Sequence, residues 1–117
     1  MIQKHFLNSF HQTPLLEALK VGGVDHAVIV GAMSHMYIDT ATRAAYDLGL
    51  RCTLIHDACA TRDLEFQGKK VKADEMHASF MAALGWWYAK LTSTGAVYVL
   101  RLKKHQVLMR LGHPIMR

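Results

Sequence analysis

The residues best placed to do chemistry follow an apolar run at His26–Val30. The motif GAMSH, Gly31–His35, comes directly after that run and before a helical pattern. The helix predicted after this motif would present the free backbone N–H groups of its first turn to a ligand or to a developing oxyanion. The motif lacks the GxGxxG spacing of dinucleotide sites, and no GK[ST] follows it as in phosphate loops. The turn therefore predicts a ligand or oxyanion site and excludes those two nucleotide motifs.

Histidines are frequent, but their spacing does not predict a metal site. None of those before residue 100 forms an HxH or HExxH pair with the spacing that zinc sites favour. These residues are His5, His11, His26, His35, His56 and His77. We expect His77 to pack or to cap on its helix, and we expect neither a bound metal nor another cofactor.

Acidic and thiol side chains are the other candidates for chemistry. Asp57 follows a strand-like run and is the best placed carboxylate, but hydrogen bonds from its side chain to the backbone of its loop are the stronger interpretation. Asp39 and Asp47 fall on a helical pattern, where we expect solvated or helix-terminal charges. Cys52 and Cys59 form no metal-type pair and have no secretory context. Both are expected to be ordinary reduced thiols.

Three apolar runs predict the strands that would hold these residues. They are His26–Val30, Cys52–His56 and Ala96–Leu100. The first two are unbroken, as in strands that are covered on both faces. Helical patterns separate the runs, so the chain is predicted to form an α/β fold of parallel βαβ units with right-handed crossovers. In such sheets ligands bind beyond the carboxyl ends of the strands, which places the loops after the first two strands at the site.

Apolar spacing and end signals predict three helices. The first begins after the pair Thr13 and Pro14 and ends at Gly22. Gly49 is the expected C-terminal cap of the second, whose apolar residues are Tyr37, Ala41, Ala44 and Leu48. The third follows a polar loop at residues 61–72, and its apolar stripe is Met76, Phe80, Leu84, Trp87 and Leu91. We therefore expect Trp87 to lie in the core.

The length and composition predict one domain, and the surplus of basic residues lies at its C-terminal end. The 117 residues are 51% hydrophobic and carry a net charge of +5. Residues 1–100 hold nine basic and nine acidic residues, so the surplus lies in residues 101–117, which contain no acid. Such a segment could bind nucleic acid or an anionic membrane, and Val107, Leu108 and Leu111 could form a weak amphipathic helix. We expect instead a basic tail without selected function, and no nucleic-acid partner.

Sequence signals for export or membrane insertion are absent. No run approaches the roughly 18 apolar residues of a membrane span, and the N-terminus lacks a signal pattern. The sequence therefore predicts a cytoplasmic protein without a membrane partner.

Three motifs resemble the isochorismatase-like cysteine hydrolases and together cover most of residues 4–95. They are KHFLNSFHQTPL (Lys4–Leu15), GAMSHMYIDTATRAAYDLGL (Gly31–Leu50) and HDACATRDLEF (His56–Phe66). The second resembles the nucleophile segment of the family, with Tyr37 where the catalytic cysteine usually stands. The first resembles the segment that bears the catalytic lysine, which Lys4 matches.

The resemblance implies hydrolysis of a small amide or imide by a cysteine thiolate, with an aspartate as general acid and base and a lysine that supports both. It also implies a cis peptide between Ala32 and Met33, oxyanion donors at the N–H groups of Met33 and Tyr37, and a pocket lined by His35. The aspartate of the family precedes the lysine, and this chain has no matching residue. Isochorismatases proper also lack the cysteine, but they use that aspartate. Because a phenol is a poor and bulky nucleophile, we expect activity to be lost or impaired.

The fold implied by the resemblance is a three-layer, Rossmann-like parallel sheet with strand order 3-2-1-4-5-6. The chain would begin at the third strand, with Ile2 and Gln3 in a strand separated from His26–Val30 by a gap. Residues 1–100 would form an isochorismatase-like hydrolase domain that is incomplete at its N-terminus, and residues 101–117 the basic tail. Exposed strand edges would favour a homo-oligomer. The alternative to a small-molecule hydrolase is a non-catalytic subunit that assembles with itself or with a full-length relative.

Overall fold

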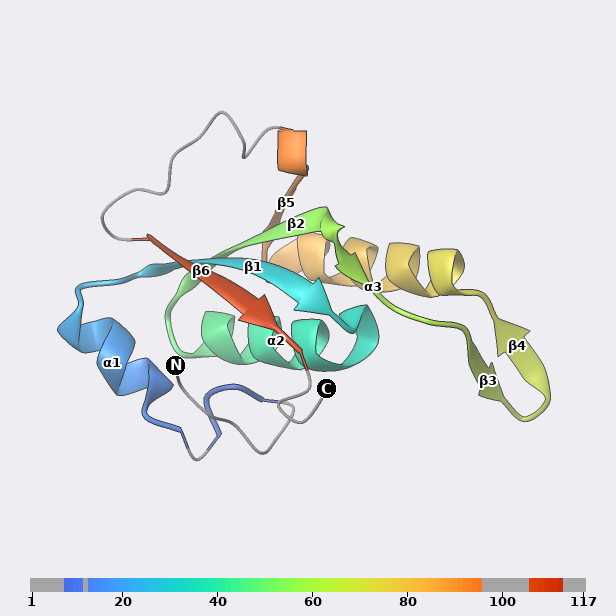
Figure 1. Ribbon diagram of the computed structural model, residues 1–117, viewed down its shortest axis with the longest axis horizontal. Helices are drawn as coiled ribbons and strands as arrows, with labels where there is room; N and C mark the ends of the chain where they lie inside the picture. The colour runs from blue at the N-terminus through green and yellow to red at the C-terminus, as the bar shows by residue number, and fades with distance from the viewer. Residues whose placement is uncertain (1–7, 12, 96–105, 113–117) are drawn as a thin grey trace.

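A four-stranded parallel sheet forms the centre of the protein (Figure 1). The computed structural model describes residues 8–11, 13–95 and 106–112. The strand order is β5-β2-β1-β6, and every neighbouring pair is parallel. The strands are β1 (His26–Ala32), β2 (Arg51–Ala60), β5 (Lys90–Thr92) and β6 (Gln106–Leu111). The predicted α/β fold with a parallel sheet is thus confirmed.

Helices alternate with the strands along the chain. They are α1 (Leu15–Val21), α2 (Asp39–Asp47) and α3 (Ala73–Trp87). A π-helical turn, η1 (Ser34–Ile38), lies directly between β1 and α2. The hydrophobic core contains residues from all three α-helices and from β1, β2 and β6. The order of elements therefore follows the predicted alternation.

β1 lies between two parallel neighbours and carries the centre of the core. Ala27, Val28 and Ile29 are all buried, as predicted for a strand that is covered on both faces. Its register with β2 shifts after Ile29, and from there Gly31 lies opposite Cys59. β2 extends beyond the predicted strand, so the carboxyl ends of β1 and β2 meet at one edge of the sheet.

α2 buries a different set of residues from the predicted one. Its buried side chains are Ala41, Thr42 and Ala45, whereas Leu48 is 42% exposed. Leu48 lies beyond the last helical residue, in the turn that Gly49 closes with a φ of 92°. The glycine cap is therefore confirmed, but the apolar stripe was extended one turn too far.

α3 ends before the end of its predicted apolar stripe. Its buried residues are Met81 and Leu84, and Leu91 belongs to β5 instead of the helix. Trp87 is the last helical residue and is 61% exposed, so its prediction as a core residue is wrong. A Cβ on Gly85 would come within 2.7 Å of Leu91 Cδ1. Leu91 thus packs onto α3 from the strand that follows it.

The segment predicted as a polar loop before α3 contains a β-hairpin. β3 (Leu64–Phe66) and β4 (Lys69–Val71) pair in antiparallel orientation. Gln67 and Gly68 at the tip have positive φ angles of 49° and 80°, which tight hairpin turns favour. The hairpin projects away from the central sheet (Figure 1).

β6 comes from the segment that the sequence suggested to be a basic tail. Its register places Gln106 opposite His26 and Leu111 opposite Gly31. Met109 and Leu111 are buried while the residues before each of them are exposed, which is the alternation of a strand. The interpretation of this segment as an amphipathic helix is therefore wrong. β6 fills the position beside β1 at which the resemblance implied a gap.

Two predicted strands, at Ile2 and Gln3 and at Ala96–Leu100, lie outside the described residues. In the part of the chain that the structure describes, β5 and β6 are the edge strands of the central sheet. No helix in that part is long and apolar enough to cross a membrane.

Candidate functional site

The candidate site lies at the carboxyl end of β1, where the chain turns into η1 and α2 (Figure 1). The peptide bond between Ala32 and Met33 is cis, as the resemblance implied. Gly31, just before it, has a φ of 127°. A Cβ at this position would lie 2.0 Å from the carbonyl oxygen of Leu111, so glycine allows β6 to run this close. β6 therefore packs directly against the turn.

Hydrogen bonds tie the turn to two neighbouring elements. Ser34 is fully buried, and its hydroxyl donates to the carbonyl oxygen of Ala60 at 3.3 Å. The same Oγ lies 2.8 Å from Nδ1 of His77 on α3. The carbonyl oxygen of Met33 accepts a backbone hydrogen bond from the N–H group of Ile38 at 3.2 Å. The turn is thus held by β2 and α3 as well as by its own backbone.

His35 connects η1 with the end of β2. Its Nδ1 is hydrogen-bonded to the hydroxyl of Thr61, and its ring meets the ring of Phe80 edge-on at 6.2 Å. Burial lowers the pKa of His35 below its ordinary value, and the nearby charge of Arg62 lowers it further. The imidazole is therefore mainly neutral at pH 7, and it can act there as a hydrogen-bonding group without positive charge.

Tyr37, at the predicted nucleophile position, belongs to the hydrophobic core. It lies in η1, and only 4% of its surface is exposed. Its neighbours in the core cluster include Ile38 and Ala41. A phenol enclosed in this way has little access to the carbonyl group of a substrate. Tyr37 therefore contributes packing at the start of α2.

The other predicted site residues are not all brought to the turn. Lys4 lies outside the described residues. Asp57 accepts a hydrogen bond from the N–H group of Thr94 at 2.8 Å, and hydrogen bonds from the side chain and backbone of Thr94 lower the pKa of its carboxyl group. Its side chain thus bonds to the backbone, as the sequence favoured, but Asp57 lies within β2 and its partner follows β5 instead of belonging to its own loop. Asp39 begins α2 and pairs with Arg43 at 2.9 Å, as expected for a helix-terminal charge.

Both cysteines are free thiols, and neither is activated. Cys52 is buried in β2, and Cys59 lies opposite Gly31. Burial raises the pKa of each thiol to about 11. Both are therefore protonated at neutral pH, and neither matches the reactive thiolate that cysteine hydrolysis requires.

The described histidines are dispersed over the fold. His26 lies at the amino end of β1, where it is hydrogen-bonded to Thr53 and Gln106, while His35 and His77 lie at the opposite end of the sheet. Among residues 8–11, 13–95 and 106–112, no three His, Cys, Asp or Glu side chains are grouped so that they could hold a metal ion.

Comparison with known proteins agrees with this architecture. Residues 1–85 match the family model of the isochorismatase domain. The chain belongs to the isochorismatase family. It is 44% identical over 96 residues to the uncharacterized isochorismatase family protein YddQ of Bacillus subtilis (strain 168), an alignment that covers 82% of this chain and 53% of that protein. The fold is thus that of an isochorismatase-family, hydrolase-like protein.

Two further relatives show how much of an isochorismatase-family protein this chain covers. Nicotinamidase 3 of Arabidopsis thaliana is 28% identical over 91 residues, which cover 78% of this chain and 41% of that protein. A solved structure from Oleispira antarctica has a TM-score of 0.80 and 49% identity, and the match covers 84% of this chain and 52% of that chain. The chain thus spans about half the length of these relatives. The family model ends at residue 85, so β5 and β6 lie beyond the residues that it matches.

The sequence alone did not predict the contacts that hold the cis-peptide turn. Ser34 and His77 are 43 residues apart, and Thr61 is separated from His35 by the whole of α2 and β2. One signal could have indicated His77, because it lies one helical turn before the buried Met81 on α3. Its partner on η1 depends on how α3 packs, which no local pattern reveals.

Proposed function

We propose that this isochorismatase-family domain binds a small amide or imide at the cis-peptide turn and hydrolyses it slowly or not at all. Tyr37 carries the proposal, because it stands at the predicted nucleophile position and the residue is only 4% exposed in the core. In this proposal the backbone N–H groups of Met33 and Tyr37 receive the carbonyl oxygen of the substrate. Neutral His35 lines the site, and Lys4 supplies the supporting cation.

The chemistry of C–N hydrolysis explains why activity should be low. The reaction needs a nucleophile at the carbonyl carbon and a proton for the departing nitrogen. The two thiols are protonated at neutral pH, and Asp57 is engaged with the Thr94 segment. Among the residues that the structure describes, the turn therefore has no activated nucleophile with a paired acid.

Ammonia release from nicotinamide tests the catalytic part of the proposal. Nicotinamide is a rational first substrate because a relative of this chain is named a nicotinamidase. We expect no release above the rate without protein, both for the chain as it stands and for the variants Lys4→Ala and Tyr37→Phe. Turnover by the unmodified chain that both substitutions abolish would show that Tyr37 acts in catalysis, and it would overturn the proposal.

A non-catalytic assembly subunit is the second candidate function, and the edge strand β6 favours it. Leu108 on this strand is 52% exposed, and in the described part of the chain no strand pairs with the outer side of β6. Such an edge can pair with another copy or with a relative. Light scattering at micromolar concentration should show a dimer or larger species, which Leu108→Lys should weaken. A monodisperse monomer of 13.2 kDa would contradict self-assembly.

A further inference from the structure

The first half of α3 contacts the candidate site through one face of the helix. His77 and Phe80 are three residues apart on α3, so their side chains lie on the same face. His77 Nδ1 lies 2.8 Å from the Oγ of Ser34, and the Phe80 ring meets the His35 ring edge-on at 6.2 Å. Ser34 and His35 are the first two residues of η1. Two neighbouring residues of the turn are therefore each in contact with α3.

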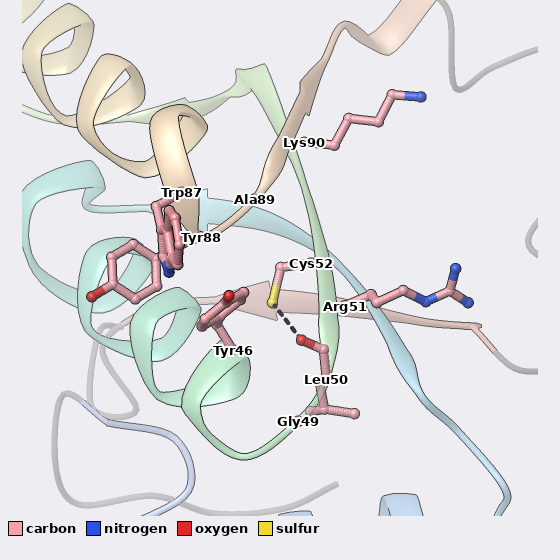
Figure 2. Close-up of a pocket in the computed structure, with 9 residues that line it drawn as sticks. All are labelled: Tyr46, Gly49, Leu50, Arg51, Cys52, Trp87, Tyr88, Ala89 and Lys90. Carbon is pink, nitrogen blue, oxygen red and sulfur yellow. Dashed lines mark hydrogen bonds between the residues drawn. The ribbon is translucent and has the colours of Figure 1, made fainter.

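α3 is anchored at both of its ends. At its first residue, the N–H group of Ala73 donates to Oδ1 of Asp63 at 2.7 Å. At its other end, the Tyr46 ring of α2 meets the rings of Trp87 and Tyr88 at centroid distances of 6.4 and 5.3 Å (Figure 2). Side chains on an element held in this way fix a site more precisely than side chains on a loop. The helix is therefore a suitable support for the turn.

The buried hydroxyl of Ser34 determines which nitrogen of His77 carries a proton. Ser34 is fully buried, and a hydroxyl has one proton to donate. It donates to the carbonyl oxygen of Ala60 at 3.3 Å, and a carbonyl oxygen only accepts. Both contacts of Ser34 Oγ are hydrogen bonds at once only when Nδ1 of His77 is protonated and donates. The geometry thus indicates a neutral His77 with its proton on Nδ1.

Ser34 connects this network to the backbone groups that would receive a substrate. It follows Met33, whose carbonyl oxygen accepts hydrogen bonds from the N–H groups of Met36 at 3.0 Å and Ile38 at 3.2 Å. The two proposed oxyanion donors, the N–H groups of Met33 and Tyr37, lie on either side of Ser34 in the chain. Such donors are effective only when they are held in place before the substrate arrives. A displacement of Ser34 would therefore weaken the proposed site.

We propose that His77 is a positioning residue of the candidate site, because its hydrogen bond to Ser34 fixes the backbone N–H groups that receive the carbonyl oxygen of the substrate. His77 itself contacts no substrate. The inference deepens the proposed function and rests on it, since the turn is where the carbonyl group is received. A hydrogen bond with a purely structural role would stabilise the fold without changing reactivity at the turn. The two roles therefore predict different results when His77 is substituted.

A thiol at position 37 reports on the turn in the full chain. In Tyr37→Cys, the rate of alkylation by iodoacetamide at pH 7 measures how strongly the turn and the start of the helix favour the thiolate. Addition of His77→Ala should lower this rate about tenfold, because small displacements at a site are costly. His77→Asn should restore the rate to within about twofold, because the amide nitrogen of asparagine can take the place of Nδ1 as donor. His77→Gln should not, because its nitrogen lies near the place of Nε2.

Two further variants test whether His77 acts through Ser34. Ser34→Ala removes the acceptor, and its combination with His77→Ala should lower the rate no further than either substitution alone. Ser79→Ala is the matched control, because Ser79 is exposed on α3, and it should leave the rate unchanged. Urea denaturation of each variant separates a loss of stability from a loss of reactivity.

Amide hydrogen exchange tests the positioning of the turn without a reagent or a grafted thiol. In the unmodified background, His77→Ala should exchange residues 33–38 faster, and His77→Asn should keep their protection. If the thiol of Tyr37→Cys is no more reactive than Cys52 and Cys59 although His77 is present, the proposed function fails, and exchange alone decides whether His77 positions the turn.

Three results would overturn the proposal for His77. They are equal alkylation rates for His77→Asn and His77→Gln, a rate for His77→Ala equal to that of Ser79→Ala, and exchange of residues 33–38 that His77→Ala leaves unchanged. Nitrogen-15 NMR of the neutral ring should show the proton on Nδ1. A proton on Nε2 instead would also contradict the proposal, because Nδ1 would then have none to donate to Ser34.

Discussion

Gln106 Nε2 lies 2.9 Å from Nδ1 of His26 and joins the first residues of β6 and β1. The other ring nitrogen of His26 lies 2.8 Å from the hydroxyl of Thr53 on β2. The side-chain amide nitrogen donates, so Nδ1 accepts and Nε2 carries the proton that is donated to Thr53. One imidazole thereby connects three adjacent strands of the sheet at their amino ends.

Removal of this amide should destabilise the sheet. We expect Gln106→Ala to lower the free energy of unfolding by about 1 kcal/mol, because His26 Nδ1 loses its donor. Urea denaturation followed by circular dichroism measures the change. Arg110→Ala, at an exposed position on the same strand, is the matched control and should change stability less. Equal effects of the two substitutions would show that the hydrogen bond does not contribute to the docking of β6.

Glycine at position 31 should be required for the pairing of β1 and β6. An added Cβ would lie 2.0 Å from the Leu111 carbonyl oxygen, and the φ of 127° is unfavourable for other residues. We expect Gly31→Ala to cost about 3 kcal/mol or more, because backbone has to move as well as side chains. Urea denaturation again provides the measurement.

Gly23→Ala serves as the control for Gly31→Ala. Gly23 also has a positive φ, of 70°, but a Cβ there would meet no atom within 4 Å. Its substitution should therefore cost only about 1 kcal/mol, the penalty of the backbone conformation alone. If the two alanine variants melted alike, β6 would not run against the turn as closely as the structure places it.

Local sequence patterns were sufficient to predict β1, which leads into the candidate site, but not β6, which lies beside it. The unbroken run of β1 indicated burial on both faces, and the motif after it resembled the isochorismatase nucleophile segment, so the position of the turn and its cis peptide could be predicted. β6 depends on a contact between residues 80 positions apart, and its few apolar residues fit a helix as well as a strand. Trp87 had helical spacing with core residues, yet α3 ends there and leaves the ring at the surface.

A grafted nucleophile should be reactive if the turn is assembled as proposed. Tyr37→Cys places a thiol at the start of α2 in the space that the phenol fills, where the helix N-terminus and Lys4 favour the thiolate. We expect iodoacetamide near pH 7 to label this thiol selectively, as detected by mass spectrometry of peptides. Cys52 and Cys59 are internal controls, because burial raises the pKa of both to about 11. Labelling no faster than theirs would count against the proposed oxyanion turn and the role of Lys4.

Stability should fall in mild acid because of His35. Burial and Arg62 lower its pKa in the fold, so the unfolded chain binds a proton at a higher pH than the folded chain does. The contribution of His35 is therefore complete above the ordinary pKa of about 6.5 and is lost as the pH falls through the lower folded value. We expect the melting temperature to decrease between pH 7.5 and pH 5.5.

Substitution of His35 separates this titration from that of the carboxyl groups. His35→Asn should melt at a lower temperature at pH 7.5, because contact with Thr61 is altered, and its melting temperature should depend less on pH between 7.5 and 5.5. Asp57 provides the contrast. Its pKa is lowered by Thr94, so its contribution is present above the ordinary carboxyl pKa of about 4 and is lost only in stronger acid. Asp57→Asn should therefore keep the same dependence of the melting temperature on pH between 7.5 and 5.5 as the unmodified chain. If His35→Asn kept this dependence as well, titration of His35 would be ruled out as its cause.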